Sequence, residues 1–128
     1  MEQPPVITLD DLLRRARARL DRISPQDLEA EIRTGALIVD VRTSEQRQRD
    51  GVLPGAHLID LTVLEWRLAP SSPNRDLDFP PTRRVILVCS EGYSSSLAAA
   101  RLQDLGLMNA TDLAGGFRGW KSWKDGSD

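Results

Sequence analysis

The sequence has few of the residues that build metal centres and disulfides. It contains one cysteine, Cys89, and one histidine, His57, among 128 residues. A lone cysteine excludes a disulfide within the chain and a metal site of several cysteines, and a lone histidine argues against a histidine-rich metal centre. We therefore expect no metal and no cofactor. Any nucleophilic chemistry at Cys89 must depend on backbone groups and charge more than on a neighbouring base.

Long apolar runs and a strong net charge are also missing. No apolar stretch approaches the roughly 20 residues of a membrane-spanning helix, and the first residues, MEQPPVITLDD, are too acidic for a secretory signal. The formal net charge of -2 argues against a protein that binds nucleic acid through a basic face. The hydrophobic share of 40% is typical of a globular chain. We expect one domain in the cytoplasm, with no membrane and no nucleic-acid partner.

The order of apolar and polar residues predicts alternating strands and helices. Segment 36–41 is rich in branched apolar residues, which is typical of a strand buried on both faces of a parallel sheet, and 85–88 repeats this pattern. Ser24 and Pro25 suit the start of a helix, and Gly35 suits its end. We expect strands at 36–41, 56–59, 85–88 and 110–113, and helices at 8–23, 25–34, 43–50, 62–68, 95–105 and 117–124. This order is typical of an α/β fold with a mainly parallel sheet.

The segments outside this core leave alternatives open. The predicted helix 8–23 has an apolar face, which packs either on the domain or on a second copy of the chain in a homodimer. Its other face is basic, with Arg14, Arg15, Arg17 and Arg19. That face suits an acidic lipid surface or partner, although a solvated face explains it better. The loop 70–83, which contains four prolines, is either a functional loop, such as a lid or a binding loop, or a solvated excursion.

Cys89 lies where a reactive group is expected in such a fold. It follows the predicted strand 85–88 and precedes a polar turn, 90–94, and a helix. Ligands of open α/β sheets bind beyond the carboxyl ends of the strands. The N–H groups of the turn and the helix dipole favour a thiolate, and Gly92 permits the positive φ of a close turn. The alternative is a structural cysteine, but a polar turn leading into a serine-capped helix favours the reactive one.

Four short motifs, in order along the chain, resemble those of the rhodanese family. Segment 89–95, Cys-Ser-Glu-Gly-Tyr-Ser-Ser, resembles the rhodanese active-site loop, with cysteine first and glycine fourth. Segment 38–42 looks like the family's Asp-Val-Arg strand end, and 51–56 is similar to its Gly-x-x-Pro-Gly-Ala turn. Segment 115–120 resembles its closing Gly-Gly-x-x-x-Trp. Each motif alone is weak, but together they span nearly the whole of the domain and are highly specific.

The resemblance implies a fold and a division of the chain. The fold would be a three-layer α/β sandwich, with helices on both faces of the sheet and an extra helix at the N-terminus. Residues 1–23 would be an N-terminal amphipathic helical extension, 24–124 the rhodanese-like domain, and 125–128 a disordered tail.

The resemblance also implies sulfurtransferase activity. Cys89 would take sulfane sulfur from thiosulfate or a persulfide, hold it as a persulfide, and pass it to an acceptor such as a thiol or cyanide. Asp40 would either brace the loop through hydrogen bonds or form a buried pair with Arg42 that fixes the strand end, and we favour the pair. Arg42 would either orient an anionic donor or belong to that pair. The implied active-site loop consists of Ser90, Glu91, Gly92, Tyr93, Ser94 and Ser95.

Two other classes compete with this interpretation, and one feature departs from it. Rhodanese-like domains also serve as non-catalytic binding or regulatory modules. The related phosphatases have a loop that is one residue longer and ends in arginine, which is absent here. The loop of this chain also has no cation and one carboxylate, Glu91, so a thiosulfate dianion should be attracted weakly. Our hypothesis is that a persulfide is the better donor.

The remaining candidate residues have simpler interpretations. Arg67 is a candidate for the missing cation, but we favour an ordinary surface arginine. For His57 we favour a structural role over that of a general base. Trp120 and Trp123 share one face of a predicted helix, where packing on the domain explains both.

Overall fold

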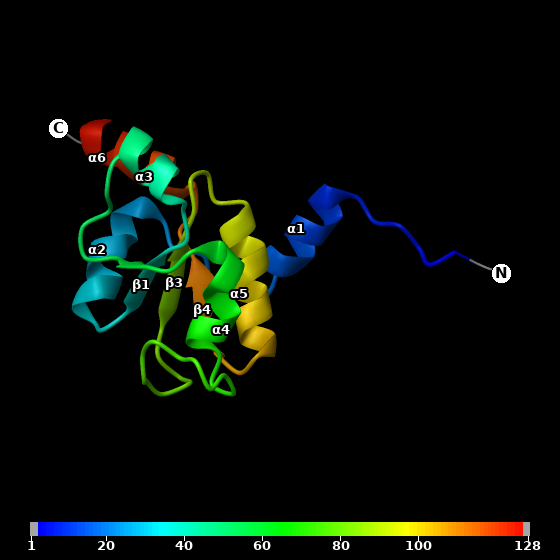
Figure 1. Cartoon of the computed structure of the whole chain (residues 1–128). Helices are drawn as coiled ribbons and strands as arrows, with labels where there is room; N and C mark the ends of the chain where they lie inside the picture. The colour runs from blue at the N-terminus through cyan, green and yellow to red at the C-terminus, as the bar shows by residue number, and fades with distance from the viewer. Residues whose placement is uncertain (1–2, 127–128) are drawn as a thin grey trace.

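Four short parallel strands form the centre of residues 3–126, the part of the chain that the computed structural model describes (Figure 1). The strands are β1 (Leu37–Asp40), β2 (His57–Leu58), β3 (Val85–Val88) and β4 (Ala110–Asp112). Their order in the sheet is β2-β1-β3-β4. Because they all run in one direction, their carboxyl ends meet at one edge, where ligands of such sheets bind.

Helices cover both faces of this sheet and confirm the three-layer α/β sandwich. The helices are α1 (Leu9–Arg17), α2 (Pro25–Arg33), α3 (Ser44–Asp50), α4 (Leu64–Leu68), α5 (Ser94–Asp104) and α6 (Gly116–Gly126), with a 3-10 turn, η1 (Leu61–Val63), before α4. The cores place α4 and α5 on one face and α2 and α6 on the other. Helix α1 packs against α5 on the outside of the sandwich and projects from the body (Figure 1).

Alternate residues of the strands enter two separate cores, because successive side chains of a strand point to opposite faces. Val39 and Leu87 enter the first core, and Ile38 and Ile86 enter the second. Full burial of such a side chain contributes roughly 1.5–3 kcal/mol. The helices add Leu64, Leu68, Ala98, Ala99 and Leu102 to the first core, and Leu28 and Phe117 to the second. Apolar residues on both faces of the strands thus produce the buried parallel sheet.

The N-terminal helix is shorter than the sequence predicts. Thr8 caps it, accepting a hydrogen bond from the N–H of Asp11 at 3.0 Å, but the helix ends at Arg17 instead of Ile23. Ile23 lies beside Leu113 in an isolated parallel bridge, where its N–H donates to the carbonyl of Asp112 at 3.0 Å. Pairing at the edge of the sheet therefore replaces the last helical turns, and Ile23 is buried in the second core.

The C-terminus also differs from the expected disordered tail at 125–128. Helix α6 continues to Gly126, and Asp125 lies 3.6 Å from Lys121, one turn earlier. Such pairs support a helix by a few tenths of a kcal/mol, about 0.2–0.5. Residues 127 and 128 of the expected tail lie outside the described residues.

The proline-rich loop 70–83 lies at the end of the sheet where β3 begins (Figure 1). It precedes β3, whereas Cys89 follows β3. The loop is packed: Phe79 is buried in the first core, and the N–H of Asp76 donates to the carbonyl of Arg67 at 3.0 Å. It is therefore neither a lid over Cys89 nor a fully solvated excursion. The side chain of Arg67 is 40% exposed and lies 3.9 Å from Asp76, as a surface arginine does.

Between residues 3 and 126, none of the helices has the length and apolar character needed to cross a lipid bilayer.

Candidate active site

Cys89 lies at the carboxyl end of β3 and lines a pocket of about 530 Å³. Cys89 is buried, with 7% of the residue exposed, and it borders open space only where it lines this pocket. The turn that follows enters α5 at Ser94 and contributes much of the lining. The lining residues from this turn are Ser90, Glu91, Tyr93 and Ser94; those from the end of β1 and from η1 include Arg42, Thr43, Asp60 and Thr62.

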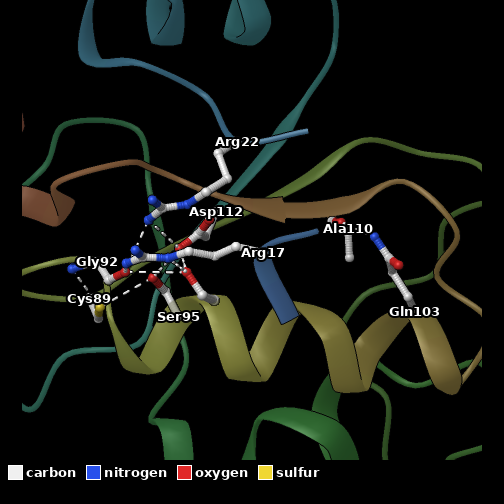
Figure 2. Close-up of polar contacts among 9 residues, drawn as sticks. Arg17, Arg22, Cys89, Gly92, Ser95, Gln103, Ala110 and Asp112 are labelled. Carbon is white, nitrogen blue, oxygen red and sulfur yellow. Dashed lines mark hydrogen bonds and ion pairs between the residues drawn. The ribbon is translucent and has the colours of Figure 1, made fainter. Parts of the chain in front are cut away.

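Hydrogen-bond groups surround the sulfur of Cys89 (Figure 2). The N–H of Gly92 donates to Sγ at 3.1 Å, and the thiol lies 3.2 Å from Oγ of Ser95. Burial raises the pKa of the Cys89 thiol, but hydrogen bonds from Ser95, Ser94 and Gly92 outweigh it, so the pKa lies below its usual value. The arrangement thus favours the thiolate, which is the nucleophilic form of cysteine.

The start of α6 holds the loop from outside. The N–H of Phe117 donates to the carbonyl of Cys89 at 2.8 Å, and the N–H of Arg118 donates to that of Ser90 at 3.0 Å. This approach requires glycine at position 116, because a Cβ there would lie 2.5 Å from the Cys89 carbonyl oxygen. Gly92 itself has φ of 84°, in the left-handed region. The loop and the Gly115–Gly116 turn therefore form one packed unit.

The serines at the start of α5 do not cap the helix, contrary to the sequence prediction. Tyr93 is the N-cap residue and makes no side-chain cap bond. The hydroxyls of Ser95 and Ser96 both donate to the same carboxylate oxygen of Asp112, Oδ2, each at 2.7 Å. Asp112 is fully buried at the end of β4 and pairs with Arg22 at 2.9 Å. A buried carboxylate thus occupies the hydroxyls that the sequence assigns to the helix end.

Residues 24–122 match the Rhodanese-like domain. The chain belongs to the rhodanese-like domain family. The thiosulfate sulfurtransferase GlpE of Pseudomonas entomophila is 34% identical over 101 residues, which cover 79% of this chain and 84% of that protein.

Two solved structures resemble this rhodanese-like chain. The human single-domain sulfurtransferase TSTD1 has a TM-score of 0.66 and 25% identity, covering 79% of this chain and 95% of that one. A protein of unknown function from Rhodopseudomonas palustris, described as a possible tyrosine phosphatase, has a TM-score of 0.81 and 27% identity. That likeness covers 97% of this chain and 96% of the other, so it extends N-terminal to the rhodanese match.

The strand-end pair of this rhodanese-like domain is buried behind the pocket. Arg42 donates to Asp40 through Nη2 at 2.7 Å and through Nε at 3.0 Å, and to the carbonyl of Gly51 at 3.0 Å. Its guanidinium also lies 3.9 Å from the centre of the Phe117 ring. Both side chains are fully buried. The pair with Asp40 neutralises the charge of Arg42, and its ring contact links the end of β1 to α6. Nη1 of Arg42 has no hydrogen-bond partner among the described residues and Arg42 lines the pocket, so orientation of an anionic donor by Arg42 stays a prediction.

The other predicted site residues divide between the pocket and the surface. Glu91 is exposed at the pocket rim and pairs with Arg118 at 2.8 Å, which the sequence does not predict. Tyr93 is exposed and its ring lies 5.8 Å from the guanidinium of Arg17. His57 is exposed on β2 and does not line the pocket. Trp120 packs on Phe117, as expected, but Trp123 is 39% exposed.

Sequence reasoning missed Asp112, Arg17 and Arg22 as neighbours of the loop. Asp112 had a usable signal, because it ends a predicted strand and a parallel sheet brings strand ends to one edge. The arginines had none, since their contacts depend on where α1 ends. Among residues 3–126, no cluster of three or more histidine, cysteine, aspartate or glutamate side chains could hold a metal ion.

Proposed function

We propose that this rhodanese-family sulfurtransferase carries sulfane sulfur as a persulfide on Cys89. The observation that supports the proposal most is the environment of the sulfur: it lines a pocket and lies within hydrogen-bond distance of Gly92 N–H and Ser95 Oγ. The Gly92 N–H donates to the sulfur, and the Ser95 hydroxyl becomes a second donor to a thiolate when it turns its proton away from Asp112. Such donors stabilise a negative charge on sulfur, both on the free thiolate and on the persulfide anion. The curated relatives named thiosulfate sulfurtransferase agree with this chemistry.

The reaction needs two displacements at sulfur. The Cys89 thiolate attacks the sulfane sulfur of the donor, forming a new S–S bond while the old bond breaks. Thiosulfate would release sulfite, and a persulfide would release its thiolate. An acceptor such as cyanide or a thiolate then attacks the outer sulfur, and the Cys89 thiolate leaves. Charge is conserved in each step, and no proton, oxidant or cofactor is required.

The charges around the pocket support a persulfide donor over thiosulfate. Two carboxylates, Asp60 and Glu91, line it, and the one lining arginine, Arg42, is paired with Asp40. Glu91 in turn neutralises Arg118 at the rim. A dianion therefore meets no unpaired lining cation among the described residues. The pocket should therefore attract the thiosulfate dianion weakly, and a donor with less negative charge should be repelled less by its carboxylates.

Thiocyanate formation tests the sulfur-transfer proposal. Purified protein with cyanide should form thiocyanate faster from cysteine persulfide than from thiosulfate, judged by kcat/KM. Cys89→Ser should lower both rates to those measured without protein, because cyanide also reacts with cysteine persulfide in solution. Equal activity of Cys89→Ser would refute the role of the cysteine, and high efficiency on thiosulfate that collapses with added salt would refute the donor preference.

A charge substitution sharpens the donor test. Glu91→Gln removes a carboxylate from the pocket and leaves Arg118 paired with Asp50 at 3.5 Å, so it should raise kcat/KM for thiosulfate about threefold to fivefold at low salt. The value for cysteine persulfide should change less. Glu29→Gln is a matched control, because Glu29 also pairs with an arginine, Arg33, but does not line the pocket. An equal effect of both substitutions would contradict the electrostatic explanation.

Two alternatives are distinguished in the same preparation. A binding module would form no thiocyanate with either donor. A phosphatase would hydrolyse an aryl phosphate, as the description of the Rhodopseudomonas palustris neighbour suggests for that protein. The loop of this chain has no arginine between Cys89 and α5 to bind a phosphate ester, so we expect no phosphatase activity.

A further inference from the structure

Two arginines donate to the carbonyl oxygen of Gly92 in the active-site loop. Nη2 of Arg17 donates at 2.8 Å and Nη2 of Arg22 at 3.0 Å, whereas Ser96, whose Oγ lies 3.2 Å away, gives its one proton to Asp112 at 2.7 Å. Both arginines precede the rhodanese match at 24–122: Arg17 ends α1, and Arg22 lies in the segment that follows. Figure 2 shows them side by side above Gly92 and Ser95. A segment outside the family domain thus reaches its catalytic loop.

These contacts fix the orientation of a peptide plane. In a trans peptide the N–H points away from the preceding C=O. Because the arginines hold the carbonyl of Gly92 on the outer side of the loop, the N–H of Tyr93 is turned to the inner side. Helix α6 holds the carbonyls of Cys89 and Ser90 in the same way. The arginines therefore complete a set of outer contacts that keeps the loop amides directed inward.

Arg22 has a second effect, through Asp112 and Ser95. The hydroxyl of Ser95 has one proton and two neighbouring acceptors, Oδ2 of Asp112 at 2.7 Å and Sγ of Cys89 at 3.2 Å. Arg22 contacts both carboxylate oxygens of Asp112, at 2.9 and 3.2 Å, and Ser96 also donates to it. Asp112 therefore keeps three other hydrogen bonds when Ser95 turns its proton toward a Cys89 thiolate. Without Arg22, the buried carboxylate would compete for that proton.

We infer that Arg17 and Arg22 are positioning residues of the sulfur-transfer site, which hold the Gly92 carbonyl outward and free the Ser95 hydroxyl for the sulfur. The inference rests on the proposed function for its reaction, but it concerns the thiolate itself. Helix α1 and residues 18–22 then belong to the active site, although the sequence suggests an appendage.

The charges on the two sides of the loop decide whether loss of an outer arginine favours or disfavours the Cys89 thiolate. On the outer side, two guanidiniums face one carboxylate, so positive charge is in excess. On the pocket side, apart from the Asp40–Arg42 pair, two carboxylates, Asp60 and Glu91, balance two cations, Arg47 and Arg118. Removal of an outer cation should therefore disfavour the thiolate. The charged and titratable groups around the loop are Arg17, Arg22 and Asp112 outside, and Asp60, Glu91, Arg118, Tyr93, Arg47 and the Asp40–Arg42 pair on the pocket side.

The rate of Cys89 alkylation by iodoacetamide, measured against pH on the full chain, tests this inference. In Arg17→Gln the midpoint of the profile should rise by about 0.5–1 pH unit, so the rate below the midpoint falls about threefold to tenfold. Arg22→Lys keeps a cation beside Asp112, and the chain should fold, but one ammonium cannot serve both Asp112 and Gly92. Its midpoint should rise as well. Arg19→Gln is the control, because Arg19 lies nearby and pairs with Asp104 instead.

The outcomes distinguish the positioning role of Arg17 and Arg22 from the proposed sulfur transfer. Wild-type midpoints in both folded variants, or an equal rise in Arg19→Gln, would overturn the inference. If Arg17→Gln does not fold, Arg22→Lys decides alone. If the wild type forms thiocyanate but the midpoints of the arginine variants do not shift, only the positioning role of the arginines is rejected. Shifted midpoints in a protein that forms no thiocyanate would reject only the sulfur-transfer proposal.

Discussion

Replacement of Ser95 by alanine should raise the pKa of the Cys89 thiol. The Ser95 hydroxyl lies 3.2 Å from Sγ in a buried position, and the pKa of Cys89 lies below its usual value because such bonds outweigh burial. A hydrogen bond to a charged group contributes about 1.5–3 kcal/mol, and one pKa unit corresponds to ~1.4 kcal/mol. The pKa should therefore rise by about one to two units, and the thiolate fraction below the midpoint should fall about tenfold to a hundredfold.

Ultraviolet absorbance of the thiolate during a pH titration measures this pKa directly, because Cys89 is the only cysteine. Thr111→Val is the matched control. Thr111 is a fully buried hydroxyl residue next to Asp112, but its Oγ1 has no hydrogen-bond partner among the described residues. Its replacement should leave the midpoint unchanged. A Ser95→Ala midpoint within about 0.3 units of wild type, in a protein with native circular dichroism, would refute the reasoning.

Three further predictions concern the loop, the strand-end pair and the pH dependence of stability. Gly116→Ala should abolish thiocyanate formation, since its Cβ would lie 2.5 Å from the Cys89 carbonyl oxygen; Gly55→Ala, with a similar positive φ and open space, should retain it. Asp40→Asn should lower the free energy of unfolding by about 3–5 kcal/mol in urea, because it leaves the buried Arg42 guanidinium without its anion; a loss below about 1 kcal/mol would contradict this. Between the folded pKa of Cys89 and its ordinary value of 9.0, the unfolded chain binds more protons, so the free energy of unfolding should rise with pH. Cys89→Ala should lose that rise in urea titrations, and an unchanged slope would count against a lowered pKa.

Local sequence signals predict the sheet and the position of Cys89 well. Segment 85–88 is apolar throughout, and its side chains enter both cores, as a buried parallel strand requires. Gly92 follows at the point where the chain adopts a positive φ, and its N–H contacts the sulfur. These features depend on neighbouring residues in the chain, so a single sequence carries them.

The surroundings of the sulfur depend on contacts between distant segments, which no local pattern records. The helical spacing of apolar residues continues to Ile23, yet the helix stops at Arg17 because Ile23 pairs beside β4. That end point decides where Arg22 lies. Likewise, Ser95 has a sequence suited to a helix cap, but Asp112 from the neighbouring strand binds its hydroxyl. Tertiary contacts thus overrule capping and periodicity at the site itself.

Intact-mass measurement after a single exposure to cysteine persulfide tests the central claim most directly. The account predicts a gain of about one sulfur atom, ~32 Da, which cyanide removes as thiocyanate and which Cys89→Ser does not acquire. A wild-type mass that stays unchanged with both cysteine persulfide and thiosulfate, or an adduct that persists in Cys89→Ser, would contradict it.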